Sequence, residues 1–260
     1  MRRETQNVLL ILLGGALLKI SWNETYLRYV RPSLLPLVVF AGVAMILVAA
    51  LAIARDISAH RDRSSRVGGH SDDGAPAVAP DDGHDHDHGS GRSTWMLLVP
   101  VLAILLVAPP ALGADSVQRA GSRSVVSDEE PAGGGLFQPI DTSSEVADLQ
   151  ITDVVMRTVW DRSGTLDGRT VRVTGFVVHD VDAVHVARVR IMCCAADAVP
   201  VKLRIEGPAL AEFADHETDS WVEVTGEVVP DSATAANGHV PTFVTESVRA
   251  VEPPSDPYEY

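Results

Sequence analysis

The chain of 260 residues is 46% hydrophobic and carries a formal net charge of −14, so long apolar runs and an acidic balance occur together. The acidic balance argues against nucleic acid as a partner, because phosphate binding requires basic patches. The 2 cysteines are too few to staple a small disulfide-rich domain.

Three apolar runs predict about three transmembrane α-helices within a membrane domain, residues 1–114. The first run, residues 7–22, follows a basic start. A signal peptide is the alternative, but the missing small-residue cleavage site favours a retained anchor. The second run, residues 33–54, contains no charged side chain and is long enough to cross a bilayer. The third, residues 94–113, begins beside Trp95, an aromatic residue of the kind common at membrane interfaces.

Basic residues near the span ends predict the orientation of these helices. Seven arginines lie on the side of the N-terminus and the loop 55–93, against five basic residues on the other side. Because positive charge is retained in the cytoplasm, the N-terminus and this loop are expected there. We therefore expect a multi-pass protein of the cell membrane, embedded in the lipid bilayer, with an extracytoplasmic C-terminal domain.

The loop 55–93 is dominated by Gly, Pro, Ser and Asp, a composition that predicts disorder. Within it, His84, His86 and His88 alternate with Asp85 and Asp87. Imidazole and carboxylate groups are ligands for zinc, nickel or copper, so one interpretation is a loose metal buffer or a donor to a transport path. The other interpretation is a solvated low-complexity loop without a specific role.

The C-terminal half contains a single predicted folded domain. Residues 115–147 predict a flexible linker, residues 148–253 the domain, and residues 254–260 a tail. The domain opens with an amphipathic helix for which Asp148 is the candidate cap, and its apolar positions recur at helical spacing: Ile151, Val154, Val155, Thr158 and Val159.

The rest of this domain alternates apolar and polar residues with a period of two, which predicts strands. Three such segments precede a short helical stretch, "PALAEFADHE", and two follow it. The order β-β-β-α-β-β predicts a mainly-β, OB-like barrel, with another small barrel or a sandwich as the alternative. Gly175 and Gly226 are expected to relieve crowding where strands bend.

The two cysteines, Cys193 and Cys194, are adjacent in "RVRIMCCAADAVPV". If the strand continues through them, their thiols point to opposite faces and cannot form a disulfide with each other. The following residues "AADA" are not strand-like, and Asp197 suits a turn, so the strand can also end here.

Four interpretations of the pair remain open. The thiols can be structural, or they can ligate a metal together with Asp197 or a histidine such as His179 or His185. They can instead form a redox-active vicinal disulfide in the oxidising exterior, or contact a partner protein. Under the metal interpretation, the expected ion is a divalent transition metal such as zinc, and no other cofactor is expected.

Motifs for catalysis are missing from the sequence. It contains no Ser-His-Asp order, phosphate loop or H-E-x-x-H helix, so we do not expect an enzyme. A thiol oxidoreductase is a weaker possibility, because the C-x-x-C spacing is also missing.

The segment "RVRIMCCAADAVPV", after three predicted spans and followed by "WVEVTGEV", resembles the C-terminal domain of the YcgQ-like bacterial membrane proteins. The resemblance covers the spans and about the last hundred residues, and its distinctive motif runs from Cys193 to Ala198. It implies a subunit of a two-component permease complex whose partner is a larger, polytopic, permease-like membrane protein. It also implies a connection to metal homeostasis or acid tolerance.

The resemblance, together with the predicted spans and domain, implies an accessory permease subunit whose extracytoplasmic OB-like domain covers or gates the partner. Three apolar spans cannot line a polar path by themselves, because transport sites inside membranes need ionisable or polar groups. The alternatives are a stand-alone metal-binding membrane protein and, less favoured, an extracytoplasmic thiol redox protein.

Overall fold

The computed structural model describes residues 3–67, 110–120, 137–140 and 144–260. The chain divides into two compact units. One comprises Met1–Tyr26 and Ser33–Pro109, and the other comprises Leu27–Pro32 and Pro110–Tyr260. The histidine tract 84–88 and most of the predicted third span lie outside the described residues.

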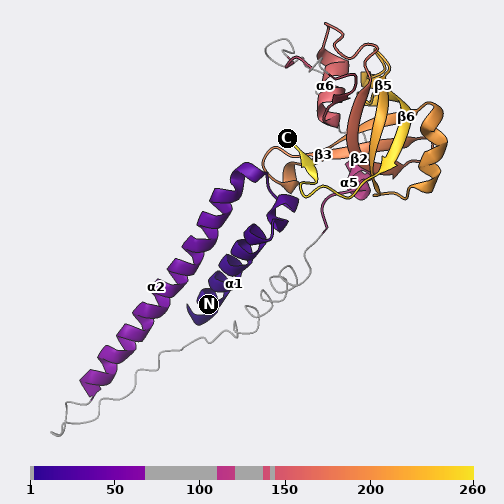
Figure 1. Cartoon of the computed structure of the whole chain (residues 1–260). Helices are drawn as coiled ribbons and strands as arrows, with labels where there is room; N and C mark the ends of the chain where they lie inside the picture. Colours follow the sequence, from indigo (N-terminus) through magenta and orange to yellow (C-terminus); the bar gives the residue numbers. More distant parts are fainter. Residues whose placement is uncertain (1–2, 68–109, 121–136, 141–143) are drawn as a thin grey trace, which may run out of the picture. The chain divides into compact units, whose positions relative to one another are not determined.

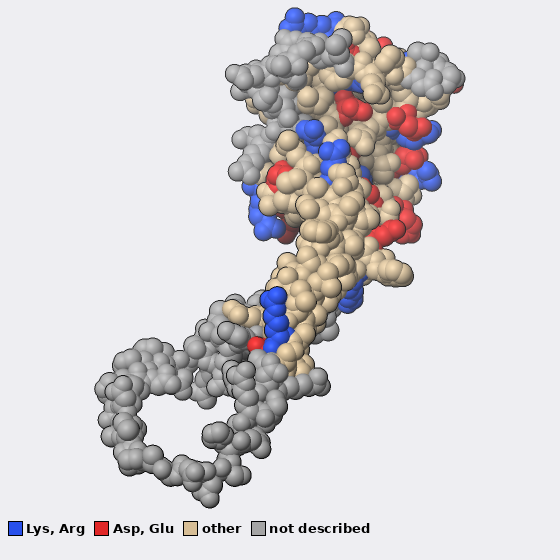
Figure 2. Space-filling model, turned by 90° about the vertical axis from the view of Figure 1, so that its left-hand side faces the viewer, with Lys and Arg blue, Asp and Glu red and all other residues tan. Residues whose placement is uncertain are grey.

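The first unit is a pair of apolar helices, α1 (Arg3–Trp22) and α2 (Leu35–Val67), which pack against each other (Figure 1). They approach closely at two glycines, because a Cβ atom added to Gly14 would lie 2.8 Å from the carbonyl oxygen of Gly42. Small residues at such a crossing are typical of helices that pack within membranes. Charged side chains gather on the C-terminal unit, and few are seen on the helix pair in Figure 2.

Within the described residues, one helical stretch, Pro32–Ser58, is long and apolar enough to cross a membrane, and most of it lies in α2. It contains the predicted span 33–54, and its apolar side chains at Leu37 and Phe40 are more than half exposed. The predicted span 7–22 falls in a shorter apolar helix. Of the predicted span 94–113, only Pro110–Gly113 is described, and this stretch is not helical. The structure therefore does not support three transmembrane helices.

Helix α2 also continues past Ala54, through Val67, into the segment predicted to be a disordered loop. The residues from 55 to 67 contain neither Gly nor Pro, so nothing in them stops the helix. Likewise, α5 (Ala114–Ala120) lies where the sequence suggested a linker.

The C-terminal unit is a closed β-barrel, which confirms a barrel in this half of the chain (Figure 1). Its strands pair in the order β2-β5-β6-β4-β3, and β3 returns to β2. Strands β4 and β6 pair in parallel, whereas the other neighbours around the barrel are antiparallel. The barrel strands are β2 (Val171–His179), β3 (Val184–Arg190), β4 (Val199–Glu206), β5 (Trp221–Val228) and β6 (Thr242–Ala250).

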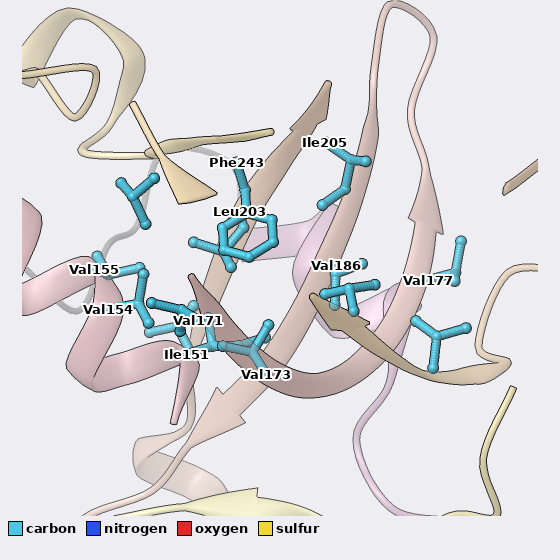
Figure 3. Close-up of a cluster of buried hydrophobic side chains, with 14 of the residues drawn as sticks. Ile151, Val154, Val155, Val171, Val173, Val177, Val186, Leu203, Ile205 and Phe243 are labelled. Atoms are coloured by element: carbon cyan, nitrogen blue, oxygen red, sulfur yellow. The ribbon is translucent and has the colours of Figure 1, made fainter. Parts of the chain in front are cut away.

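The barrel core is built from the alternating apolar positions of these strands and from one face of α6 (Ile151–Trp160) (Figure 3). Ile151, Val154 and Val155 are buried against the strands, as the helical spacing predicts. The segment Pro208–Asp215, between β4 and β5, is a 3-10 helix. Gly226 stands at a register shift between β5 and β6, where a Cβ atom would lie 2.1 Å from the carbonyl oxygen of Val244. The expectation that Gly226 relieves crowding is therefore confirmed.

The N-terminus of α6 is capped by Glu259, far away in the sequence. Its two carboxylate oxygens accept hydrogen bonds from the backbone N–H groups of Ile151 and Thr152, at 2.9 and 2.7 Å. Glu259 is 2% exposed and also faces the Arg188 guanidinium at 3.7 Å. The predicted cap Asp148 is wrong: it lies in the short strand β1 (Ala147–Asp148) and pairs with Arg172, because the buried carboxylate already occupies the helix end.

Glu259 reaches this position from the short strand β7 (Tyr258–Glu259), which pairs in parallel with β3. The last residues of the chain are therefore part of the sheet. An anion at a helix N-terminus is favoured both by the free N–H groups and by the helix dipole. A residue within the predicted tail thus caps helix α6.

Glu259→Gln is expected to destabilise the barrel by about 3 kcal/mol, because it leaves Arg188 buried without its counter-charge and turns an amide donor toward backbone donors. The measurement is urea unfolding of the full-length protein in detergent, followed by circular dichroism of the strands. Glu252→Gln, at an exposed position, is the matched control and should change stability little. Equal midpoints for the two variants would contradict the capping role.

Candidate metal site at the cysteine pair

The cysteine pair lies in the connection between β3 and β4, residues 191–198, which we call the cysteine loop. Strand β3 ends at Arg190, the turn of 3-10 helix η3 spans Ala195–Asp197, and β4 begins at Val199. The strand does not continue through the cysteines, so the alternation of side chains along a strand does not place the two thiols on opposite faces. Cys193 is exposed and Cys194 is partly buried, and both are free thiols.

Asp197 organises this loop through its carboxylate. One oxygen accepts a hydrogen bond from the backbone N–H of Met192 at 2.8 Å, and the other accepts from Cys193 and Cys194 at 2.9 and 3.3 Å. The Asp197 N–H donates in turn to the Cys194 carbonyl oxygen at 3.0 Å. The expected turn at Asp197 is therefore confirmed, and the carboxylate folds the backbone of both cysteines around itself.

The same fold brings potential metal ligands together. The two Sγ atoms are 3.6 Å apart, and with an Asp197 carboxylate oxygen they form a group whose atoms lie within 4.8 Å of one another. A carboxylate has about four lone-pair sites, and backbone N–H groups occupy three of them here. The Cys193 thiol also interacts with this carboxylate. A metal ion could bind there in place of the thiol proton.

The ionisation states follow from this contact. The hydrogen bond from the Cys193 thiol, together with the backbone donors, lowers the pKa of Asp197 to about 2. The same hydrogen bond to Asp197, followed by the contact with Cys194, raises the pKa of Cys193 to about 12. The Cys193 thiol therefore keeps its proton at neutral pH. Because a thiol must lose its proton to ligate a metal, binding releases protons and should strengthen as the pH rises.

Two thiolates and a carboxylate suit a thiophilic ion such as zinc, which accepts sulfur and oxygen ligands. Three protein ligands leave one position of a tetrahedral ion open, as in zinc sites that exchange a ligand. The raised pKa of Cys193 also speaks against a redox nucleophile, because reactive cysteines have a lowered pKa that keeps the thiolate populated.

The histidines considered from the sequence are not part of this group. His185 is buried near the start of β3, at the end of the strand away from the cysteines, and burial and the charge of Lys202 lower its pKa to about 4. His179 Nε2 lies 2.8 Å from the His216 carbonyl oxygen. His84, His86 and His88 lie outside the described residues.

A further element of the site has no signal in the sequence: the interhelical segment, Leu27–Pro32, which joins α1 and α2 along the chain and belongs to the barrel unit. Val30 forms an antiparallel bridge with Cys194. The Arg31 N–H donates to the Cys193 carbonyl oxygen at 3.1 Å, and the Ala195 N–H donates to the Tyr29 carbonyl oxygen at 2.7 Å. This pairing joins residues separated by more than a hundred positions, which no local pattern can indicate.

Comparison with protein families gives two matches. Residues 5–123 match the DUF1980 N-terminal domain, and residues 143–260 match the DUF1980 C-terminal domain. No curated protein and no solved structure matches the chain. The second match contains the barrel strands and the cysteine loop.

Asp197→Asn is expected to accelerate alkylation of Cys193 at pH 8, because removing the carboxylate charge returns the pKa of this thiol toward its ordinary value and increases the thiolate fraction. The rate is measured with iodoacetamide and peptide mass spectrometry on metal-free protein. Asp215→Asn, in the 3-10 helix between β4 and β5, is the control and should leave the rate unchanged. An unchanged rate in Asp197→Asn would show that this carboxylate does not hold the Cys193 proton.

Proposed function

Because this chain belongs to the DUF1980 family, with matches to both of its domains, we propose that it is a membrane-anchored, metal-binding accessory subunit of a permease complex. In this proposal, the C-terminal barrel presents a transition-metal site outside the membrane and covers or gates the partner. The observation that carries the proposal is the group formed by Cys193, Cys194 and Asp197.

The metal role follows from the chemistry of this group. The loop exposes the Cys193 thiol and holds the Cys194 thiol beside it. The ionised Asp197 carboxylate lies next to both, where it could bind the same ion. Nothing about barrel packing requires two adjacent thiols at an exposed turn. The role of a purely structural pair is therefore less favoured than that of a ligand pair.

Membrane attachment and orientation rest on the apolar helices and on the basic residues that flank them. We propose that residues 7–22 and 33–54 cross the membrane and that the third apolar run crosses it before Pro110, where the barrel unit begins, with the N-terminus cytoplasmic and the barrel extracytoplasmic. The barrel is OB-like in this proposal, because its five strands follow the order of an OB barrel, with the third and fifth in parallel.

The partner is a polytopic, permease-like membrane protein. Apolar spans of this kind do not provide the polar groups that a transport path needs, so another protein must line that path. The apolar side chains exposed along α2 are suited to lipid or to the helices of such a partner. A stand-alone metal-binding protein is the alternative, and it differs by needing no partner.

Metal-free, full-length protein in detergent is expected to bind one zinc ion per chain and to release at least the Cys193 proton. Stoichiometry is measured by native mass spectrometry under anaerobic conditions, and proton release with an indicator dye. Cys193→Ser/Cys194→Ser should abolish this binding, whereas replacing His84, His86 and His88 by alanine should leave it intact. Zinc that persists in the double serine variant would refute the site.

Affinity purification of the full-length chain from its native membrane is expected to recover a polytopic partner. Deletion of residues 150–253 should abolish recovery if the barrel makes the contact. Cys193→Ser/Cys194→Ser, which leaves the barrel strands unchanged, shows whether the partner depends on the metal site. If neither the wild-type chain nor the double serine variant recovers a partner, the stand-alone alternative is favoured.

A further inference from the structure

The interhelical segment, Leu27–Pro32, contacts the cysteine loop through its backbone on both sides of Cys194. It donates the Arg31 N–H to the carbonyl oxygen that precedes Cys194, and accepts the Ala195 N–H that follows it. Asp197 holds the same residue from the other direction, through the Cys194 N–H and the Cys194 carbonyl oxygen. Cys194 is therefore held by two independent sets of hydrogen bonds.

The interhelical segment is itself tied to the end of the chain. The Tyr258 hydroxyl donates to the Arg28 carbonyl oxygen at 2.9 Å, and the Arg31 guanidinium lies 5.2 Å from the centre of the Tyr260 ring. Leu27 is 7% exposed. Because Tyr258 belongs to β7, which pairs with β3, the segment is anchored to the strand that leads into the cysteine loop.

We infer that the interhelical segment is a positioning element of the metal site, and that metal occupancy and the docking of this segment are coupled. The inference rests on the proposed function for its metal part. A bidentate pair of adjacent thiols requires a defined backbone at Cys193 and Cys194, because rotation of the peptide between them would turn the Sγ atoms apart. The segment restrains that peptide through the Arg31 N–H, which donates to the Cys193 carbonyl oxygen, and it restrains the next peptide by accepting the Ala195 N–H.

Coupling between two sites is reciprocal. If the docked segment strengthens metal binding, then a bound metal strengthens the docking of the segment by the same factor. The segment is continuous with α1 and α2 along the chain. Metal occupancy would therefore be communicated to the helix pair through the backbone that joins its two helices, which gives the subunit a means of reporting whether its site is filled.

The test compares two substitutions at one position in the full-length protein in detergent. Arg31→Pro removes the N–H donor to Cys193, whereas Arg31→Ala keeps that donor and removes only the guanidinium above Tyr260. Zinc affinity is measured by competition with a chromophoric chelator. Arg31→Pro should bind zinc on the order of 3- to 10-fold more weakly, the loss expected for one hydrogen bond, and Arg31→Ala should stay close to wild type. Equal affinities for the two variants would overturn the inference.

Hydrogen exchange of the wild-type protein, with and without zinc, provides a second measurement. In the wild-type protein, zinc should slow exchange in peptides that cover residues 27–32 and Ala195, and unchanged exchange there would also overturn the coupling. If wild-type protein binds no zinc, the proposed function fails, and the metal-free comparison decides the positioning role. In that case Arg31→Pro, but not Arg31→Ala, should speed exchange of the Cys193 to Asp197 amides, and equal rates would reject the positioning role as well.

Discussion

The buried carboxylate of Glu259 is the contact on which the rest of the barrel domain depends. It accepts hydrogen bonds from the first two N–H groups of α6 and faces Arg188 on β3, so one side chain joins α6, strand β3 and the end of the chain. A buried charge is costly unless it is paired and hydrogen-bonded, and here it is both. Its neighbour Tyr258 then reaches the interhelical segment, and that segment reaches the cysteine loop.

Asp197 repeats the same chemistry at the surface, with a different consequence. Its carboxylate also accepts hydrogen bonds from backbone N–H groups, but it interacts with the Cys193 thiol as well. The negative charge that shapes the loop therefore also keeps the thiol protonated when no metal is bound. In the proposed metal site, Cys193 would become a ligand only when a metal displaces this proton. This property suits reversible binding better than redox catalysis.

The two units of the chain have surfaces that suit different solvents. The helix pair leaves large apolar side chains exposed, an arrangement that is unfavourable in water and favourable in lipid. Its two helices approach closely at Gly14 and Gly42, as helices that pack within membranes do. The barrel buries its apolar side chains and carries charge on its surface (Figure 2). The interhelical segment is continuous with the helices along the chain but packs with the barrel. Within the described residues, it is the one segment that links the apolar helix pair to the barrel unit along the chain.

Local patterns in the sequence were sufficient for the barrel strands, for α6 and for the turn at Asp197. Period-two alternation identifies a half-buried strand, helical spacing identifies an amphipathic helix, and an aspartate after a strand identifies a turn, because each reflects geometry within a few residues. The same reasoning placed three potential metal ligands within five consecutive positions, from Cys193 to Asp197. It failed for the length of α2, because the polar residues after Ala54 suggested a loop although they are compatible with a helix.

Only the tertiary structure decided which groups satisfy the ends of these elements. Asp148 lies close to α6 in sequence, but Glu259 caps the helix, because β7 brings a buried carboxylate to the free N–H groups. The end of β3 at Arg190 placed both thiols outside the barrel, and Val30 became the backbone partner of Cys194. The sequence by itself determined which residues could bind a metal, through their chemistry and spacing. The long-range hydrogen bonds that hold those residues in one arrangement depend on the closed fold, where residues far apart in the chain become neighbours.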